Sequence, residues 1–196
     1  MKLPKGWPTA SSPRIRFIHH NEFDKHLLSP ETIKHYSTFA ASTSAPPQPM
    51  PFESIPLPNG PSSASINIRA ISDPNHPAHG QYGLFAVKHI PSRSYILDYT
   101  GIIMLNELAS PTSDYCYRVD SIICIDAEFA GNEARFINDY RGTAPRANAE
   151  FRTFRDQKIG CIRVGIWSLT AGIKRGEEIV VSYGKGFWKS RIYYRT

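Results

Sequence analysis

Cysteine is scarce in this sequence, and its placement argues against most metal and disulfide chemistry. The 196 residues include three cysteines, Cys116, Cys124 and Cys161, which are widely spaced and form no Cys-x-x-Cys pair. Zinc sites and redox dithiols usually rely on such closely spaced pairs. We therefore expect no zinc or other metal site, and three reduced cysteines in the core, where free cysteine is commonly found.

Long apolar runs are also missing. No stretch approaches the roughly 20 residues that cross a bilayer, and the residues after Met1 lack the hydrophobic segment of a signal peptide. The rest of the composition, 41% hydrophobic and 20% charged, is ordinary for a globular chain. These observations predict an intracellular protein with no membrane partner.

The excess of positive charge is small. The formal charge of +6 is spread along the chain rather than gathered in one cluster. The basic residues near the C-terminus leave two interpretations open, a weak nucleic-acid contact and a solvated tail, of which the tail is favoured. These residues are Lys185, Lys189, Arg191 and Arg195.

Proline divides the chain into two parts. Residues 1–65 contain 11 of the 16 prolines, and residues 44–65 have a Pro/Ser-rich composition typical of an extended linker. Before the linker, Ser29, Pro30 and Glu31 supply an N-cap, a first-turn proline and an early acidic residue, which predict one short helix. We expect an N-terminal extension over 1–65 and a folded domain over 66–196, ending in a short aromatic and basic tail.

The second part is built of short β-like segments. GLFAV, SYILDYTG, YRVDSIICIDA, GCIRVGIWSLT and EEIVVSYG are rich in Ile, Val and Tyr, and Gly or Pro separates them. Regular alternation of strands and helices, as in a doubly wound nucleotide-binding domain, is absent. The pattern predicts a mostly β (α+β) fold with several small twisted sheets.

Four of the turns and strand ends in this part carry polar or aromatic residues in a fixed order. They are GQYGLFA (80–86), ILDYTG (96–101), ARFIND (134–139) and RGEEIVVSYG (175–184). Their order and spacing resemble the Gly-x-Gly, Glu-Tyr-x-Gly, Arg-Phe-x-Asn-His and Gly-Glu-Glu-hydrophobic-x-x-Tyr-Gly motifs of the SET domain, a family of protein-lysine methyltransferases. Pro145 and Asn148 resemble the Pro-Asn pair that closes its central block.

The resemblance implies a fold and a cofactor. The fold would be a set of small sheets with a pseudoknot, in which the C-terminal segment passes under a loop closed near the Arg-Phe-x-Asn motif. The cofactor would be S-adenosylmethionine, held by backbone near its methionine part, by an asparagine amide, and by an aromatic residue on the adenine, for which Phe187 is an alternative. The residues expected to bind it are Gln81, Tyr82, Gly83, Arg135, Phe136, Asn138 and Trp188.

The family also implies an aromatic channel for the substrate lysine. Tyr115 and Phe151 match its lining, and Tyr183 and Tyr99 match residues expected to be catalytic, with Tyr183 the first choice. Methyl transfer needs a neutral amine aligned behind the methyl group. Free lysine has a pKa near 10.4, and an apolar channel lowers the cost of deprotonating it.

The sequence departs from the family pattern at the presumed site. Asp139 replaces the usual histidine, and an ionised carboxylate accepts hydrogen bonds but donates none. The supporting network must therefore differ, or the protein is slow or inactive. The stretch between Asn138 and Asn148 is longer than in the compact form of the family, and it carries Arg141 and Arg146, for which we expect solvent exposure.

Two functions follow from these residues. The first is an S-adenosylmethionine-dependent protein-lysine methyltransferase that acts on a histone tail or another basic peptide, in the nucleus rather than the cytoplasm. Asp98, Asp114 and Asp120 are expected near the channel, where they would offset the chain's own positive charge. The second is an inactive SET module that binds peptide or nucleic acid, and the replacement of the family histidine by Asp139 is the reason to consider it.

Phe151 weakly favours di- or trimethylation of the substrate lysine, because phenylalanine leaves more space than tyrosine.

Overall fold

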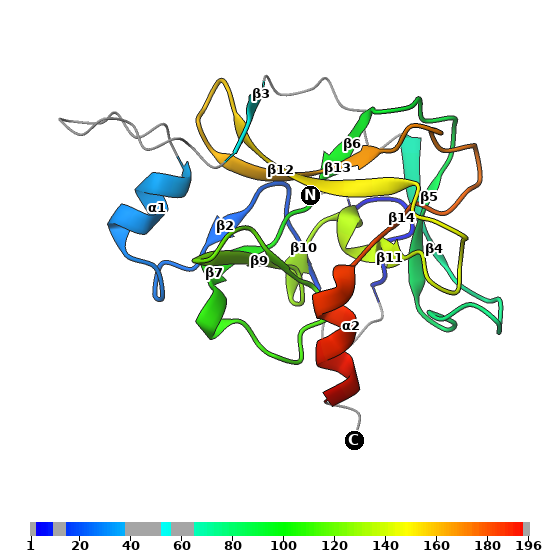
Figure 1. Cartoon of the computed structure of the whole chain (residues 1–196), viewed down its shortest axis with the longest axis horizontal. Helices are drawn as coiled ribbons and strands as arrows, with labels where there is room; N and C mark the ends of the chain where they lie inside the picture. Colours follow the sequence, from blue (N-terminus) through cyan, green and yellow to red (C-terminus); the bar gives the residue numbers. More distant parts are fainter. Residues whose placement is uncertain (1–2, 10–14, 38–51, 56–64, 194–196) are drawn as a thin grey trace.

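The computed structural model describes residues 3–9, 15–37, 52–55 and 65–193, and its strands form several small sheets (Figure 1). The strands are β1 (Arg16–Phe17), β2 (Glu22–Phe23), β3 (Ser54–Ile55), β4 (Ile66–Ala70), β5 (Tyr82–Ala86), β6 (Tyr95–Asp98), β7 (Ile102–Leu105), β8 (Cys116–Arg118), β9 (Ile123–Asp126), β10 (Ala130–Gly131), β11 (Asn138–Asp139), β12 (Ala149–Asp156), β13 (Ile162–Ser168) and β14 (Val180–Val181). The helices are α1 (Pro30–Ser37), α2 (Gly184–Tyr193) and two 3-10 turns, η2 (Asn106–Leu108) and η3 (Glu133–Phe136).

Two four-stranded sheets form most of the framework. In one, the strand order is β3-β12-β13-β6, and β12 and β13 pair antiparallel from Ala149 opposite Ser168 to Arg155 opposite Ile162. In the other, the order is β2-β7-β9-β8. The pairs β4-β5, β1-β10 and β11-β14 make smaller sheets. This arrangement confirms the mostly β fold that the sequence predicted.

Branched aliphatic side chains fill the space between the sheets. Isoleucine and valine suit strands because their side chains pack well on a pleated surface. Burying one such side chain stabilises the fold by about 1.5–3 kcal/mol relative to leaving it exposed. Residues with no exposed surface include Leu84, Ile96, Ile123, Val164, Ile166, Ile173 and Ile179. The apolar segments identified in the sequence therefore form strands, and their buried side chains make up this core.

The strand β14 is threaded through a loop. It pairs in parallel with β11, with Asn138 opposite Val180. On its other side, Val180 N donates to Asn148 Oδ1 at 2.9 Å, and Asn148 Nδ2 donates to Glu178 O at 2.8 Å. Residues 138 and 148 flank one loop, so the chain at Val180 passes between the two ends of that loop. This threading is the pseudoknot that the family resemblance implied.

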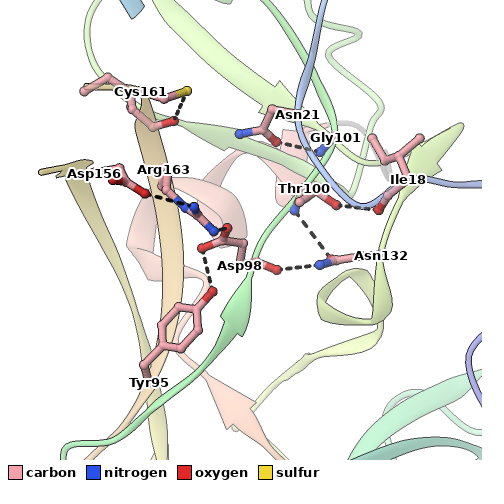
Figure 2. Close-up of polar contacts among 11 residues, drawn as sticks. Ile18, Asn21, Tyr95, Asp98, Thr100, Gly101, Asn132, Asp156, Cys161 and Arg163 are labelled. Atoms are coloured by element: carbon pink, nitrogen blue, oxygen red, sulfur yellow. Dashed lines mark hydrogen bonds and ion pairs between the residues drawn. The ribbon is translucent and has the colours of Figure 1, made fainter. Parts of the chain in front are cut away.

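The described part of the N-terminal extension packs on the same body. β1 pairs in parallel with β10, and β2 pairs in parallel with β7. Figure 2 shows two side-chain bonds at this junction: Gly101 N donates to Asn21 Oδ1 at 3.0 Å, and Thr100 Oγ1 donates to Ile18 O. The indole of Trp7 contacts the ring of Phe136 edge-on, with 5.4 Å between centroids. Residues before the linker therefore contribute strands and core to the domain.

The predicted helix after Ser29 is present as α1. Thr32 N donates to Ser29 Oγ at 3.2 Å, which is the expected N-cap. Within the Pro/Ser-rich segment, Ser54 and Ile55 form β3 and pair with β12. Of the rest of that segment, only Phe52, Glu53 and Ser65 are among the described residues. The backbone of β3 is extended, as expected for the segment, and it pairs with β12; outside the described residues the extended conformation stays a prediction.

The strand β12, the longest of the described strands, was not predicted from the sequence because its residues AEFRTFRD are rich in charge. Arg155 and Asp156 are nevertheless buried, since Asp156 accepts from the Arg163 guanidinium and from the turn that follows β12. The C-terminal segment, expected only as an aromatic tail, is the helix α2, which extends away from the sheets (Figure 1). None of the helices in the described ranges has the length and hydropathy needed to cross a membrane.

Candidate active site

A cavity of about 90 Å³ lies where β6, β8, β12 and the segment after β14 meet. Such a volume is suited to a slender chain of a few atoms rather than to a bulky ring. It is lined by Tyr99, Asp114, Tyr115, Cys116, Tyr117, Arg135, Ile137, Phe151, Ser182, Tyr183 and Phe187. The four residues expected to form the channel, Tyr99, Tyr115, Phe151 and Tyr183, are therefore brought together.

The walls of the cavity are aromatic rings in mutual contact. The ring of Phe151 meets the ring of Tyr99 edge-on at 5.5 Å between centroids and the ring of Tyr117 at 4.9 Å. Edge-on and tilted pairs of this kind are favourable because a ring edge is positive and a ring face negative. The sequence analysis missed Tyr117. Its position two residues after Tyr115 was a usable signal, because alternate residues of a strand point to the same side.

Tyr183 is fixed at both its backbone and its hydroxyl. Its N–H donates to Asp139 Oδ2 at 2.7 Å, and its phenol donates to Ile137 O at 2.7 Å. Burial, reinforced by the negative charge of Asp139, raises the pKa of Tyr183 well above its ordinary value. The phenol therefore stays protonated, and with its proton given to Ile137 its oxygen can only accept from a group in the cavity.

Tyr99 is held in a similar way. Its hydroxyl donates to Tyr115 O, and its side chain is almost completely buried. Burial raises the pKa of Tyr99 as well, with the neighbouring Tyr183 and Asp126 adding to the effect. Both tyrosines therefore present neutral hydroxyl oxygens, and neither can serve as a base.

Arg135 and Phe136, both expected on the cofactor side, occupy different places. The Arg135 guanidinium lies 4.0 Å above the Tyr115 ring and donates from Nε to Ala127 O, so it belongs to the wall of the aromatic cavity. Phe136 packs on the Tyr82 ring at 5.9 Å between centroids. Phe136 therefore supports the start of β5, the strand that carries the glycine-containing motif.

A second group of polar contacts surrounds Asn138, next to the strand β5. Asn138 Nδ2 donates to Tyr82 O at 3.2 Å and to Glu178 Oε1 at 2.7 Å. Both amide hydrogens are therefore used, and the orientation of the amide follows because both neighbours are acceptors. Asn138, Tyr82 and Gly83 come together here, while the side chain of Gln81 is exposed.

Asp139 is the centre of a network that the family histidine could not make in the same form. Its carboxylate accepts from Tyr183 N, from Arg141 N at 2.9 Å, and from the Arg141 guanidinium at 2.8 and 3.0 Å. Burial alone would raise the pKa of Asp139, but these hydrogen bonds outweigh it and lower the pKa below its ordinary value. The expectation that Arg141 is exposed to solvent holds only in part: its side chain keeps 39% of its surface exposed, and its guanidinium pairs with Asp139. Arg146 is exposed, as expected.

The two aromatic candidates on α2 point to different sites. Phe187 lines the aromatic cavity and packs on the Tyr183 ring at 4.7 Å between centroids. Trp188 keeps 38% of its surface exposed, and its Nε1 approaches Asp139 Oδ2 at 3.4 Å. Trp188 is therefore the more exposed member of the pair. Arg195 and the side chains of Lys189 and Arg191 lie outside the described part, so the nucleic-acid contact stays a prediction.

The expectation about acidic residues near the channel is wrong for two of the three. Asp98 pairs with Arg163 and accepts from the Tyr95 hydroxyl at 2.8 Å (Figure 2), and it is not among the residues that line the cavity. Asp120 accepts from the Tyr36 hydroxyl at 2.6 Å. Only Asp114 lines the cavity. Over the described residues, no group of three His, Cys, Asp or Glu side chains is placed to hold a metal ion.

The family model described as "SET domain" matches residues 81–184, more than half of the chain. The protein therefore belongs to the SET domain family. The match includes Asn138, the threaded strand β14 and the residues that line the aromatic cavity except Phe187.

Curated relatives align over the same region. Over 117 residues the chain is 30% identical to the "Histone-lysine N-methyltransferase, H3 lysine-4 specific" of Mycosarcoma maydis, covering 55% of this chain and 7% of that protein. It is 34% identical over 115 residues to the "Histone-lysine N-methyltransferase set-2" of Caenorhabditis elegans, covering 54% and 7%. The chain thus spans only a small part of these relatives. A solved structure of Polycomb Repressive Complex 2 from Chaetomium thermophilum aligns at 20% identity, with a TM-score of 0.48, over 65% of this chain and 17% of that chain.

Proposed function

We propose that this protein is a protein-lysine methyltransferase that uses S-adenosylmethionine. The observation that carries the proposal is the position of the two-residue strand β11 between two sites. Asp139 binds the backbone of Tyr183 at the aromatic cavity, and the preceding residue Asn138 binds β5 on the other side. One short strand thus supports both the lysine channel and the cofactor site.

The cofactor fits the polar group around Asn138. Within the described part of the chain no group donates to Asn138 Oδ1, so this oxygen is free to accept from a ligand. The partly exposed ring of Trp188 is available to pack on a planar base. S-adenosylmethionine has matching amino and adenine groups, and it would supply a methyl group carried on a positively charged sulfur.

The residues of the cavity provide three contributions to methyl transfer. The rings of Tyr99, Tyr117 and Phe151 hold the lysine side chain in line, which removes much of the entropic cost of the reaction. The largely aromatic lining of the cavity disfavours the ammonium form of lysine. The hydroxyl oxygen of Tyr183 accepts an amine hydrogen, and aromatic faces tolerate the positive charge that forms on nitrogen.

A basic peptide, such as a histone tail, is the proposed substrate. Several relatives are named histone-lysine methyltransferases, and Asp114 at the cavity lining has the charge that suits a cationic peptide. Such peptides bind SET domains as extended strands, for which backbone pairing gives affinity and pockets give selectivity. A histone substrate would place the protein in the nucleus.

The alternative function is an inactive module that binds peptide. It rests on Asp139, which stands where the family has histidine. The carboxylate nevertheless binds both Tyr183 N and the Arg141 guanidinium, so the position of Tyr183 is supported by Asp139 itself. This favours the enzyme over the inactive module.

The proposal is tested by incubating the purified protein with radiolabelled S-adenosylmethionine and a panel of histones, nucleosomes and cell extract. We expect label on a lysine, which mass spectrometry would identify. Cofactor binding in calorimetry without label on any member of the panel would favour the inactive module. Absence of both binding and label would overturn the proposal.

A further inference from the structure

His76 lies outside the residues that match the family model, yet its side chain reaches the group around Asn138. It sits in the turn that precedes β5, and its Nε2 lies 2.9 Å from Glu178 Oε2. The exposed fractions of the two side chains are 11% and 9%. A histidine and a carboxylate that are this well buried form a contact that strongly restricts both side chains.

The hydrogen bonds around His76 fix its tautomer. The backbone N–H of Ala78 donates to Nδ1 at 3.0 Å, so Nδ1 is an acceptor and carries no proton. Nε2 must then hold the proton and donate it to Glu178. Thr143 Oγ1 lies 3.2 Å from the same Nε2 and accepts from it as a second partner. His76 is thus a directed donor to Glu178.

Glu178 passes this orientation on to Asn138. Its Oε2 is bound by His76, and its Oε1 accepts from Asn138 Nδ2 at 2.7 Å. The second amide hydrogen of Asn138 goes to Tyr82 O. A flipped amide would place Oδ1 against two acceptors, which is repulsive. The carboxylate therefore keeps the Asn138 carbonyl oxygen turned toward the free side.

The packing around this chain of contacts leaves little freedom. A Cβ atom on Gly83 would lie 2.6 Å from Glu178 Oε1, so glycine at this position gives the carboxylate room to reach Asn138. Pro77 closes on the long loop after β11, where a Cβ on Gly142 would lie 2.6 Å from its Cγ. The insertion and the turn before β5 thus hold His76 between them.

We propose that His76 is a positioning residue for cofactor binding, acting through Glu178 on Asn138. The ligand group that this arrangement selects is an N–H donor, because Asn138 offers only a carbonyl oxygen. In S-adenosylmethionine the charged amino group of the methionine part fits that requirement best, since hydrogen bonds from charged donors are the stronger ones. This inference rests on the proposed function.

A purely structural role would make a different prediction. If the His76–Glu178 pair only tied the turn to the body, then loss of either bond of the imidazole would loosen the turn. The affinity for every ligand would then fall together with the stability of the protein. If His76 acts through Glu178, only the bond from Nε2 matters, and it matters only for ligands that carry the amino group.

Two substitutions separate the bonds of the imidazole. His76→Gln places an amide N–H near the position of Nε2 and gives up the bond from Ala78. His76→Asn retains an acceptor near Nδ1 and gives up the bond to Glu178. Each variant would be titrated by calorimetry with S-adenosylhomocysteine, which keeps the amino acid part, and with methylthioadenosine, which lacks it. Thermal melting would report stability.

We expect His76→Asn to weaken the binding of S-adenosylhomocysteine by about tenfold, as for the loss of one hydrogen bond to a charged group. The affinity for methylthioadenosine should be unchanged. His76→Gln should stay within about threefold of the wild type for both ligands. Wild-type affinity in His76→Asn, or equal weakening of both ligands, would overturn the inference while leaving the proposed function intact. If the wild type binds neither ligand, the proposed function falls and the inference falls with it.

Discussion

The carboxylate of Asp139 binds the backbone nitrogen of Tyr183 at 2.7 Å, and this bond fixes the start of the segment that closes the aromatic cavity. The same carboxylate holds Arg141 and approaches Trp188 Nε1. It therefore links the cavity, the loop after β11 and the helix α2. With aspartate in place of the usual histidine, the site therefore has a hydrogen-bond network of its own that holds Tyr183.

The Asp139 network predicts a dependence of stability on pH. Hydrogen bonds lower the pKa of the folded carboxyl below the unfolded value of about 3.9. Its contribution to the free energy of unfolding is therefore present above about pH 4 and is lost as pH falls through the lower, folded pKa. We expect Asp139→Asn to cost about 2 kcal/mol at pH 7, with the difference shrinking below pH 4.

Denaturant unfolding of both proteins from pH 2.5 to 7 measures this difference. Glu128→Gln is a suitable control, because burial raises rather than lowers the pKa of that carboxyl. A difference between wild type and Asp139→Asn that does not change across the acid range would show that the ionised carboxylate is not what holds the segment.

The space beside Phe151 predicts how many methyl groups the proposed methyltransferase would add. Phe151 lies between Tyr99 and Tyr117, and a hydroxyl on its ring would occupy part of a cavity of about 90 Å³. A differently sized group in a tight pocket changes discrimination by about tenfold or more. We expect Phe151→Tyr to shift the product toward monomethyl-lysine, as measured by mass spectrometry of a peptide product. Phe129→Tyr, at an exposed position, should leave the product distribution unchanged.

The packing of the N-terminal segment predicts that Trp7 has a large effect on the free energy of unfolding, although it is far from the site in sequence. Trp7 is buried against Phe17 and Phe136, with 5.0 and 5.4 Å between ring centroids. We expect Trp7→Ala to lower the free energy of unfolding by about 3–5 kcal/mol, and Leu3→Ala, at an exposed side chain, to cost much less. A loss below about 1 kcal/mol for Trp7→Ala would mean that the segment is not part of the folded body.

The sequence predicted most of the β framework and the grouping of the channel residues. Each strand or contact that it did not predict has its own physical reason. The segments around Leu84, Ile123 and Val164 were recognisable because one kind of residue, branched and apolar, decides both strand propensity and burial. The strand β12 was missed because one of its buried charges has a partner far away in the chain: the Arg155 guanidinium donates to His35 O, 120 residues away.

The contacts of the site depend on positions that spacing does not encode. The pairing of Arg141 with Asp139 follows from the shape of an inserted loop, which sequence patterns do not specify. His76 and Glu178 are 102 residues apart, so their contact depends on the threading of β14. Threaded topologies are too rare to be expected from periodicity alone. The channel tyrosines were found only because the order of the family motifs implied them.

The central claim is that Tyr183 completes a site for methyl transfer, and Tyr183→Phe tests it most directly. The variant removes the hydroxyl that bonds Ile137 O, and Tyr95→Phe is a matched control that loses a phenol bond to Asp98 outside the cavity. The account predicts that label transfer from S-adenosylmethionine falls by about 100-fold or more in Tyr183→Phe, while cofactor affinity is retained and Tyr95→Phe stays active. Undiminished label transfer in Tyr183→Phe would contradict it.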